Sequence, residues 1–451
     1  MVFSSLLFLF WFIPIFFAVY YVLPARFRNT ALFLGSIVFY AWGEPKFLVL
    51  IFISIFVNYI AGQVMHKNPK AVLTGALIFD FGMLVVFKYT GFFVENINNI
   101  FGTTISNPQL TLPLGISFYT FQIASYVIDL YRGKIKPCKN PLTLGTYLVM
   151  FPQLIAGPIV VYEMVDEELK SRKITFAMVE EGIATFILGL ASKVLIANQV
   201  GALWNDLEQI GYDRISTPLA WLGVVAFSLQ IYFDFNGYSL MAIGLGKMLG
   251  FNIPKNFNNP YISKSLTEFW RRWHITLSSW FRDYVYIPLG GNRKGKLRTY
   301  INLFIVWFLT GFWHGAGWNF IIWGLFFFVF LSLEKLFMAK ILEKNAIVAR
   351  IYSLIMIGLS WMIFAITDFS KLGLFFGKLF SCDFGSDVVY YLKNYAVVLV
   401  LGCVFSTPLL TKFYEKNRRK PLGVAALVVL FLMCTAYLTD MSYNPFLYFR
   451  F

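Results

Sequence analysis

The residue best placed for acid–base chemistry near neutral pH is His314, one of three histidines in the chain. It lies in the stretch TGFWHGAGWNF, residues 310–320, between two apolar runs that are each long enough to lie in a bilayer. Three glycines of the stretch remove side chains around it, which lets another backbone or a substrate approach, and Trp313 and Trp318 supply flat, rigid walls. These residues suit a general base in a pocket, and equally a histidine that is hydrogen-bonded between packed helices.

The second candidate, His274, follows Arg271, Arg272 and Trp273. Guanidinium groups bind phosphate and tryptophan can stack on a base, so this segment suits an anionic ligand. The alternative is an amphipathic helix that grips lipid headgroups. His66 lies in a short polar loop, where we expect it to be solvated. The scattered histidines and cysteines lack metal-ligand spacing, so we expect no metal and no bound cofactor.

The composition places these residues in a membrane. Of 451 residues, 58% are hydrophobic and only 14% charged, and apolar runs near the roughly 20 residues of a membrane-crossing helix recur from 3–22 to 422–438. We therefore expect an all-α polytopic membrane protein with about 11 transmembrane helices, forming a single membrane-embedded domain over residues 1–451. The first run has no signal-peptide pattern and is expected to be a retained helix.

The net charge of +15 does not indicate nucleic acid, because the basic residues are grouped in alternate loops. About 30 of the 38 Lys and Arg fall in one set of loops, which the positive-inside rule places in the cytoplasm. Both termini are then extracytoplasmic, and anionic membrane lipid is an expected partner of the basic loops. The same rule places His314 near the outer end of its span, on the opposite side from His274.

Two segments depart from plain spans. Residues 144–160 carry Pro152, Gly157 and Pro158 inside an apolar run, which predicts a re-entrant or broken element surrounded by protein or water, with a kinked helix as the alternative. Residues 252–298 mix tryptophans with arginines, a pattern of amphipathic helices at the headgroup level.

Charged residues inside spans are expensive and suggest either function or pairing. Lys193 and Asp234 lie deep in their runs, and neither has a partner nearby in sequence. The sequence leaves two interpretations: the two residues pair across helices, or Asp234 faces a cavity.

Five motifs carry a resemblance to a known family: FPQLIAGPI, QIYFDFNGYS with Tyr232 and Asp234, FWRRWHITLSSWFRDYVYIPLGGNR, GFWHGAGWNFIIWG and the terminal YNPFLYFRF. Together they resemble the membrane-bound O-acyltransferase family, in its bacterial branch that acetylates polysaccharides such as alginate. The resemblance covers essentially the whole chain. It implies a helix bundle around a central funnel or tunnel, with re-entrant pieces, in a bacterial inner membrane.

The resemblance also implies roles for residues. His314 matches the essential catalytic residue, proposed as general base, and His274 matches the second signature residue. Acetyl-CoA or another acyl thioester is the implied donor, with its phosphates near Arg271 and Arg272. The acceptor is an exported polysaccharide, reached through a secreted or membrane-anchored partner with a serine hydrolase-like fold; whether an acyl-enzyme forms stays open. Substrate-binding positions are expected at Trp313, Trp318, Asp234, Tyr232, Trp273, Arg271 and Arg272.

Three other functions stay open from the sequence. One is transfer of D-alanine or another acyl group to a teichoic-acid-type acceptor. Another is a transporter that moves an intact acyl donor or lipid-linked saccharide without chemistry, and the third is a scaffold subunit of an export complex.

Overall fold

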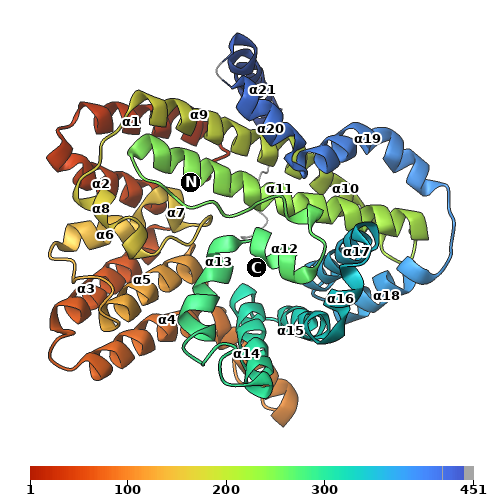
Figure 1. Ribbon diagram of the computed structural model, residues 1–451, viewed down its shortest axis with the longest axis horizontal. Coiled ribbons are helices and arrows are strands. Elements are labelled where there is room, and N and C mark those ends of the chain that lie inside the picture. Colours follow the sequence, from red (N-terminus) through yellow and green to blue (C-terminus); the bar gives the residue numbers. More distant parts are fainter. Residues whose placement is uncertain (419, 441–451) are drawn as a thin grey trace. The chain divides into compact units, whose positions relative to one another are not determined.

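The computed structural model describes residues 1–418 and 420–440, and these residues form helices and loops without a β-strand (Figure 1). The motif YNPFLYFRF, residues 443–451, lies outside the described residues. The helices group into two compact units: Met1–Phe186 with Met241–Pro254, and Ile187–Leu240 with the residues from Lys255 onward. All nine predicted site residues belong to the second unit.

Eight helical stretches of the described residues are long and apolar enough to cross a membrane: Pro45–Val64, Pro69–Phe101, Phe176–Ile210, Thr217–Leu249, Trp318–Leu342, Ala346–Ala365, Asp387–Phe405 and Pro421–Asp440. Four more predicted runs form helices that are shorter or more polar: Phe8–Val22, Arg28–Ala41, Ile116–Tyr131 and Lys296–His314. The all-α, multi-pass membrane class is confirmed. The central funnel, the single domain and the orientation of the termini stay predictions.

The first unit contains α1 (Ile13–Val22), α2 (Arg28–Ala41), α3 (Leu48–Val64), α4 (Pro69–Phe101), α5 (Ile116–Tyr131), α6 (Pro141–Val149), α7 (Phe151–Leu154), α8 (Asp166–Lys170) and most of α9 (Phe176–Ala191). The longest of them, α4, has clear start and stop signals. Asn68 caps its first turn by accepting from the backbone N–H of Ala71, Pro69 occupies the first helical position, and Gly102 ends it with a left-handed backbone.

The run at 144–160 is a broken element, as its prolines and glycine predict. Helix α6 ends at Val149, α7 adds a single turn, and residues 155–160 are non-helical and buried. The hydroxyl of Tyr147 lies 2.9 Å from the carbonyl oxygen of Val160 and can donate to it, and the Gln153 amide donates to the Tyr147 carbonyl at 2.6 Å. The protein thus satisfies backbone groups that lipid could not.

The glycine-rich stretch after Tyr238 does not interrupt the chain's helix but continues it, so that α11 runs from Thr217 to Leu249. Its last turns belong to the first unit, where Gly244 lies against α9: a Cβ on Gly182 would come within 2.7 Å of the Gly244 carbonyl oxygen. Two backbones can approach this closely only because both positions lack a side chain.

The second unit contains α10 (Asn198–Ile210), most of α11, α12 (Leu266–Arg272), α13 (Ile275–Phe281), α14 (Lys296–His314), α15 (Trp318–Leu333), α16 (Ala339–Leu342), α17 (Ala346–Ala365), α18 (Phe369–Phe380), α19 (Asp387–Phe405), α20 (Pro408–Asn417) and α21 (Pro421–Asp440). The predicted amphipathic segment 252–298 supplies α12 and α13. Its aromatic side chains are covered by protein: Trp270, Trp273 and Trp280 are each at most 7% exposed.

Candidate active site

His314 is the last residue of α14, and its imidazole is fixed by its own helix. Nδ1 lies 2.7 Å from the carbonyl oxygen of Thr310, one turn earlier, and the ring is 5% exposed. A carbonyl oxygen can only accept, so Nδ1 carries the proton of the neutral ring. Nε2 is then left with the lone pair, which is the protonation state that a general base requires.

Aromatic rings surround this imidazole. The ring centroids of Trp313, Trp323 and Phe364 lie 4.9, 4.8 and 5.6 Å from that of His314. Trp318, which the sequence suggested as a wall, is the first residue of α15 and is 52% exposed. Trp323, five residues later and fully buried, packs edge-on against His314. The setting is dry and rigid, which strengthens electrostatic interactions at the ring.

The glycines beside His314 serve helix packing. A Cβ on Gly311 would collide with the carbonyl oxygen of Phe320, and one on Gly324 would collide with that of Trp307. Gly315 lies against the ring of Phe320 in the same way. Of the two possibilities left open by the sequence, the structure therefore shows the approach of another backbone: α14 and α15 are in contact where the catalytic candidate lies.

His274 is held by side chains instead of by its own helix. It precedes α13 with a left-handed backbone (φ 42°), and its Nδ1 lies 3.2 Å from Oδ1 of Asn256. The same oxygen accepts from the N–H and the hydroxyl of Thr276, at 3.3 and 2.9 Å. An acceptor at this position makes Nδ1 the donor, so the buried Nε2, which has no hydrogen-bond partner among the described residues, carries the lone pair.

Burial controls the charge of His274. The ring is 0% exposed, and loss of solvation lowers its pKa well below the ordinary value of 6.5, with a further lowering from the neighbouring His314. His274 is therefore neutral at physiological pH. Because protein covers the whole ring, the His274 side chain itself does not contact a lipid headgroup.

The two histidines lie close together. The ring centroid of Trp313 is 4.9 Å from His314 and 6.2 Å from His274. The expectation that they lie on opposite sides was wrong, because charge counting treats residues 252–298 as a surface loop. In the structure His274 is instead buried in the unit that contains α14.

The two arginines before His274 differ in their surroundings. Arg272 forms an ion pair with Glu268, one turn earlier, at 2.8 Å, and also donates to the Asn258 carbonyl. Arg271 is exposed and lines a cleft. Trp273 is 3% exposed, and its ring packs against Trp361 at 4.8 Å.

Two of the predicted site residues, Tyr232 and Asp234, lie on α11. Tyr232 is buried, with its ring centroid 6.2 Å from that of Trp273. Asp234 forms a buried ion pair with Lys193, which decides in favour of pairing. Phe235, its neighbour in sequence, lies edge-on to His274 at 4.7 Å.

The cleft at Arg271 has a volume of about 980 Å³. Basic side chains line it, at Lys264, Arg271, Arg282 and Lys335, together with Glu334 and Glu343. Its apolar wall includes Trp270 and Trp307, whose rings are 4.7 Å apart. Trp270 also packs at 5.7 Å on Trp323, the tryptophan that contacts His314. Two buried tryptophans thus connect the basic cleft with the catalytic candidate.

Three residues of this arrangement were missed from the sequence: Asn256, Trp323 and Glu334. The carboxylate of Glu334 is 2% exposed and accepts from the N–H of Leu266, at 2.6 Å, and from the N–H and hydroxyl of Thr267, at 3.0 and 2.7 Å. It holds the start of α12, the helix that leads to His274. The sequence did contain a signal for Glu334, because an acidic residue at the end of a long apolar run is expensive and suggests a specific role.

The site is a buried imidazole that is hydrogen-bonded through Nδ1 inside a multi-pass helical protein, and the sequence comparison identifies the class of protein. The family model described as MBOAT, membrane-bound O-acyltransferase family, matches residues 138–377, which include both histidines. The chain belongs to this family and is a membrane-bound O-acyltransferase.

Its relatives are similar over most or all of the chain. It is 35% identical to the probable alginate O-acetylase AlgI of Azotobacter vinelandii, with 100% of both chains covered. It is 41% identical to the protein of the same name from Pseudomonas syringae pv. tomato, over 94% of this chain and 85% of the relative. It is 37% identical to the peptidoglycan O-acetyltransferase of Helicobacter pylori, over 74% of this chain and 70% of the relative.

Proposed function

We propose that this chain transfers an acetyl group from acetyl-CoA on the cytoplasmic side of a bacterial cell membrane toward hydroxyl groups of an exported polysaccharide. The observation that carries the proposal is the hydrogen bond from His314 Nδ1 to Thr310, which leaves Nε2 as a base in a buried aromatic setting. The relatives are named for acetyl transfer to alginate and to peptidoglycan, which supports acetyl as the acyl group and a glycan as the acceptor.

The chemistry follows from the tautomer. Nε2 of His314 takes the proton of the acceptor hydroxyl while its oxygen attacks the thioester carbonyl carbon. The C–S bond then breaks, and the departing CoA thiolate receives the proton from the imidazolium. The net result is an O-acetyl ester and free CoA. The rings of Trp313, Trp323 and Phe364 keep water from the thioester, which limits hydrolysis.

The donor enters through the basic cleft. Its four cationic side chains suit the phosphates of CoA, and Arg271 is the predicted arginine that is free to face them, whereas Arg272 is held by Glu268. The apolar wall of Trp270 and Trp307 suits the less polar part of the donor and leads toward Trp323 beside His314. The ring of Phe235 packs edge-on against His274. Through this contact, His274 is positioned by Trp273, Tyr232 and the Lys193–Asp234 pair.

The acceptor side is extracytoplasmic, and both termini lie on that side. A secreted or membrane-anchored partner with a serine hydrolase-like fold takes the acetyl group onward to the polysaccharide. Anionic membrane lipid surrounds the basic cytoplasmic loops.

The experiment compares the parent protein with His314→Ala and His66→Ala, purified in detergent and supplied with acetyl-labelled CoA and an acceptor glycan. His66 is exposed and serves as the matched control. We expect His314→Ala to lower CoA release and acetyl transfer by about 10²- to 10⁴-fold, the usual contribution of a general base. His66→Ala should match the parent.

The same measurement separates the competing functions. A transporter releases no CoA in detergent, where no gradient exists. A scaffold subunit shows no effect of His314→Ala, and a D-alanyl transferase shows no acetyl transfer but accepts a D-alanyl thioester. Transfer at the parent rate by His314→Ala contradicts the proposed role of this residue.

A further inference from the structure

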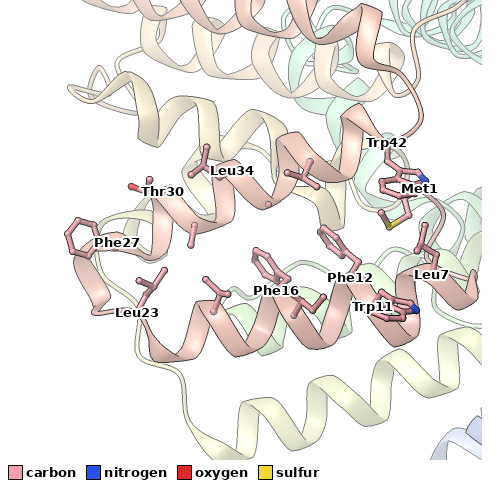
Figure 2. A pocket seen from close by; sticks show the side chains of 15 residues that line it. Met1, Leu7, Trp11, Phe12, Phe16, Leu23, Phe27, Thr30, Leu34 and Trp42 are labelled. Carbon is pink, nitrogen blue, oxygen red and sulfur yellow. The ribbon is translucent and has the colours of Figure 1, made fainter.

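An apolar groove of about 710 Å³ runs between α1 and α2 in the first unit, far in sequence from the residues of the active site (Figure 2). The side chains that line it are apolar apart from Thr30. Leu23, Phe27 and Thr30 lie at one end and Met1, Trp11 and Trp42 at the other, as Figure 2 shows. The groove therefore follows the helices along their length.

Rigid aromatic packing forms one wall of this groove. Phe12 and Phe16 line it and stack on each other at 5.7 Å, and Phe16 also packs edge-on against the buried Phe151 at 5.2 Å. Gly35 of α2 faces Phe16, where a Cβ would collide with the ring. The shape is thus built into the fold and does not depend on a few mobile side chains.

Its length suits a single lipid chain. The residues from Leu7 to Leu23 extend over roughly 24 Å at 1.5 Å per helical residue, whereas one leaflet contributes about half of the ~30 Å hydrocarbon core. Trp11 and Trp42, 65% and 62% exposed, present their rings at the far end. An acyl chain that starts at the Phe27 end therefore reaches along the groove without leaving it.

Positive charge is concentrated at the Phe27 end. The guanidinium of Arg26 lies 4.7 Å from the centre of the Phe27 ring, which lines the groove. Arg28 follows as the first residue of α2; its guanidinium lies 6.0 Å from the centre of the Tyr20 ring, and its buried Nε has no hydrogen-bond partner among the described residues. Neither arginine forms an ion pair with a carboxylate in the part of the chain that the structure describes. An anion beside an apolar chain is the ligand that completes this arrangement.

We propose that the groove between α1 and α2 binds one anionic phospholipid, with an acyl chain along the groove and its phosphate at Arg26 and Arg28. The combination of an apolar channel with two arginines at one end distinguishes this ligand from a protein helix, which needs no anion there, and from free phosphate, which needs no channel. The site is separate from the acyl-transfer site and lies wholly within the first unit.

The test uses the full-length protein, delipidated in detergent and titrated with phosphatidylglycerol or phosphatidylcholine, with bound lipid counted by native mass spectrometry. We expect the parent to prefer phosphatidylglycerol by about fivefold or more, since a basic residue near anionic lipid contributes about that factor. Arg26→Gln should lose this preference, whereas Lys67→Gln, at an exposed lysine of the next basic loop, should keep it.

A second pair of variants tests the channel. Ala31→Phe places a ring in the groove and should lower binding of both lipids, whereas Ala425→Phe, at an exposed alanine of α21, should not. Glycerol phosphate, which has the headgroup charge without the chains, should fail to compete. Equal binding by Ala31→Phe and the parent, or full competition by glycerol phosphate, overturns the proposal.

Fluorescence quenching provides a measurement that does not depend on whether the Ala31→Phe variant folds. One equivalent of chain-brominated phosphatidylglycerol should quench Trp11 in the parent. Trp11→Phe should lower the quenched fraction, while Trp204→Phe, at a tryptophan only 3% exposed, should not. A quenched fraction that is unchanged by Trp11→Phe contradicts the proposal. A stable dimer whose formation prevents quenching also contradicts it, because a second copy of the chain then covers the groove.

Discussion

The side-chain oxygen of Asn256 lies 3.2 Å from Nδ1 of His274 and determines which nitrogen of that ring carries its proton. The orientation of the amide is itself determined, because the same oxygen accepts from the Thr276 N–H and the amide nitrogen donates to Ser239 at 3.2 Å. This network leaves Nε2 unprotonated in a buried imidazole whose ring centroid lies 6.2 Å from that of Trp313, the residue before His314.

Asn256→Ala should therefore lower activity while leaving the fold in place. A lost buried hydrogen bond costs about 1–3 kcal/mol, which corresponds to roughly a ten- to hundredfold loss in kcat if the transition state bears all of it. Steady-state kinetics in detergent measure the effect. Asn252→Ala, at an exposed asparagine four residues earlier, is the control and should be silent. A parent-like kcat for Asn256→Ala would show that the tautomer of His274 is not important.

The depressed pKa of His274 makes stability depend on pH. Because the folded protein holds this ring neutral, the unfolded chain binds more protons below its ordinary pKa of 6.5, so stability present above that pH is lost as pH falls. We expect the melting temperature to decrease between pH 6.5 and 5, and the decrease to be smaller in His274→Gln. Thermal denaturation followed by intrinsic fluorescence tests this, and identical slopes for the two proteins would contradict it.

The sequence was informative where one physical signal dominates. Long apolar runs predicted α4 and the first part of α11, since burial in lipid leaves few alternatives to a helix, and Pro152 with Gly157 predicted the break after α6. Contacts between distant residues could not be predicted in the same way. The Asn256–His274 bond depends on a left-handed backbone at His274, and the contact of Trp323 with His314 depends on how α15 packs on α14.

The buried ion pair of Lys193 and Asp234 should be sensitive to the loss of one partner. Asp234→Asn leaves a buried ammonium without its counter-ion, which typically costs about 3–5 kcal/mol, whereas the double change Lys193→Met with Asp234→Leu removes both charges and should recover much of the loss. Thermal stability in detergent measures both. Lys170→Met, which breaks the exposed Lys170–Asp166 pair, is the control and should have no measurable effect. Equal losses in the single and double variants would contradict the coupling.

The contact between α14 and α15 predicts opposite effects for two glycine substitutions. Gly324→Ala places a Cβ against the Trp307 carbonyl and 3.1 Å from the Gly311 Cα, so we expect a loss of about 1–3 kcal/mol together with lower activity, because α14 ends at His314. Gly373→Ala lies in an open part of α18, where its Cβ would meet no atom of another described element within 4 Å, and should gain about 0.5–1 kcal/mol. Thermal denaturation compares them, and a neutral Gly324→Ala would mean that the helices separate easily.

Glu334 links the basic cleft to the site, since it lines the cleft and holds the first two residues of α12 by three hydrogen bonds. Removing the carboxylate in Glu334→Ala leaves the N–H groups of Leu266 and Thr267 without this acceptor. Since α12 carries Arg271 and leads to His274, both KM for acetyl-CoA and kcat should change. Bonds to a charged acceptor contribute about 1.5–3 kcal/mol each, so we expect at least a tenfold loss in kcat/KM.

Two further variants separate this positioning role from the charge of the cleft. Glu334→Gln keeps one acceptor oxygen and should be intermediate between the parent and Glu334→Ala. Glu343→Gln removes an acidic charge from the same cleft without a bond to α12, and should raise affinity for the anionic donor slightly or leave it unchanged. If Glu334→Gln and Glu343→Gln behave alike, the effect of Glu334 is electrostatic, and its hydrogen bonds to α12 do not position the site.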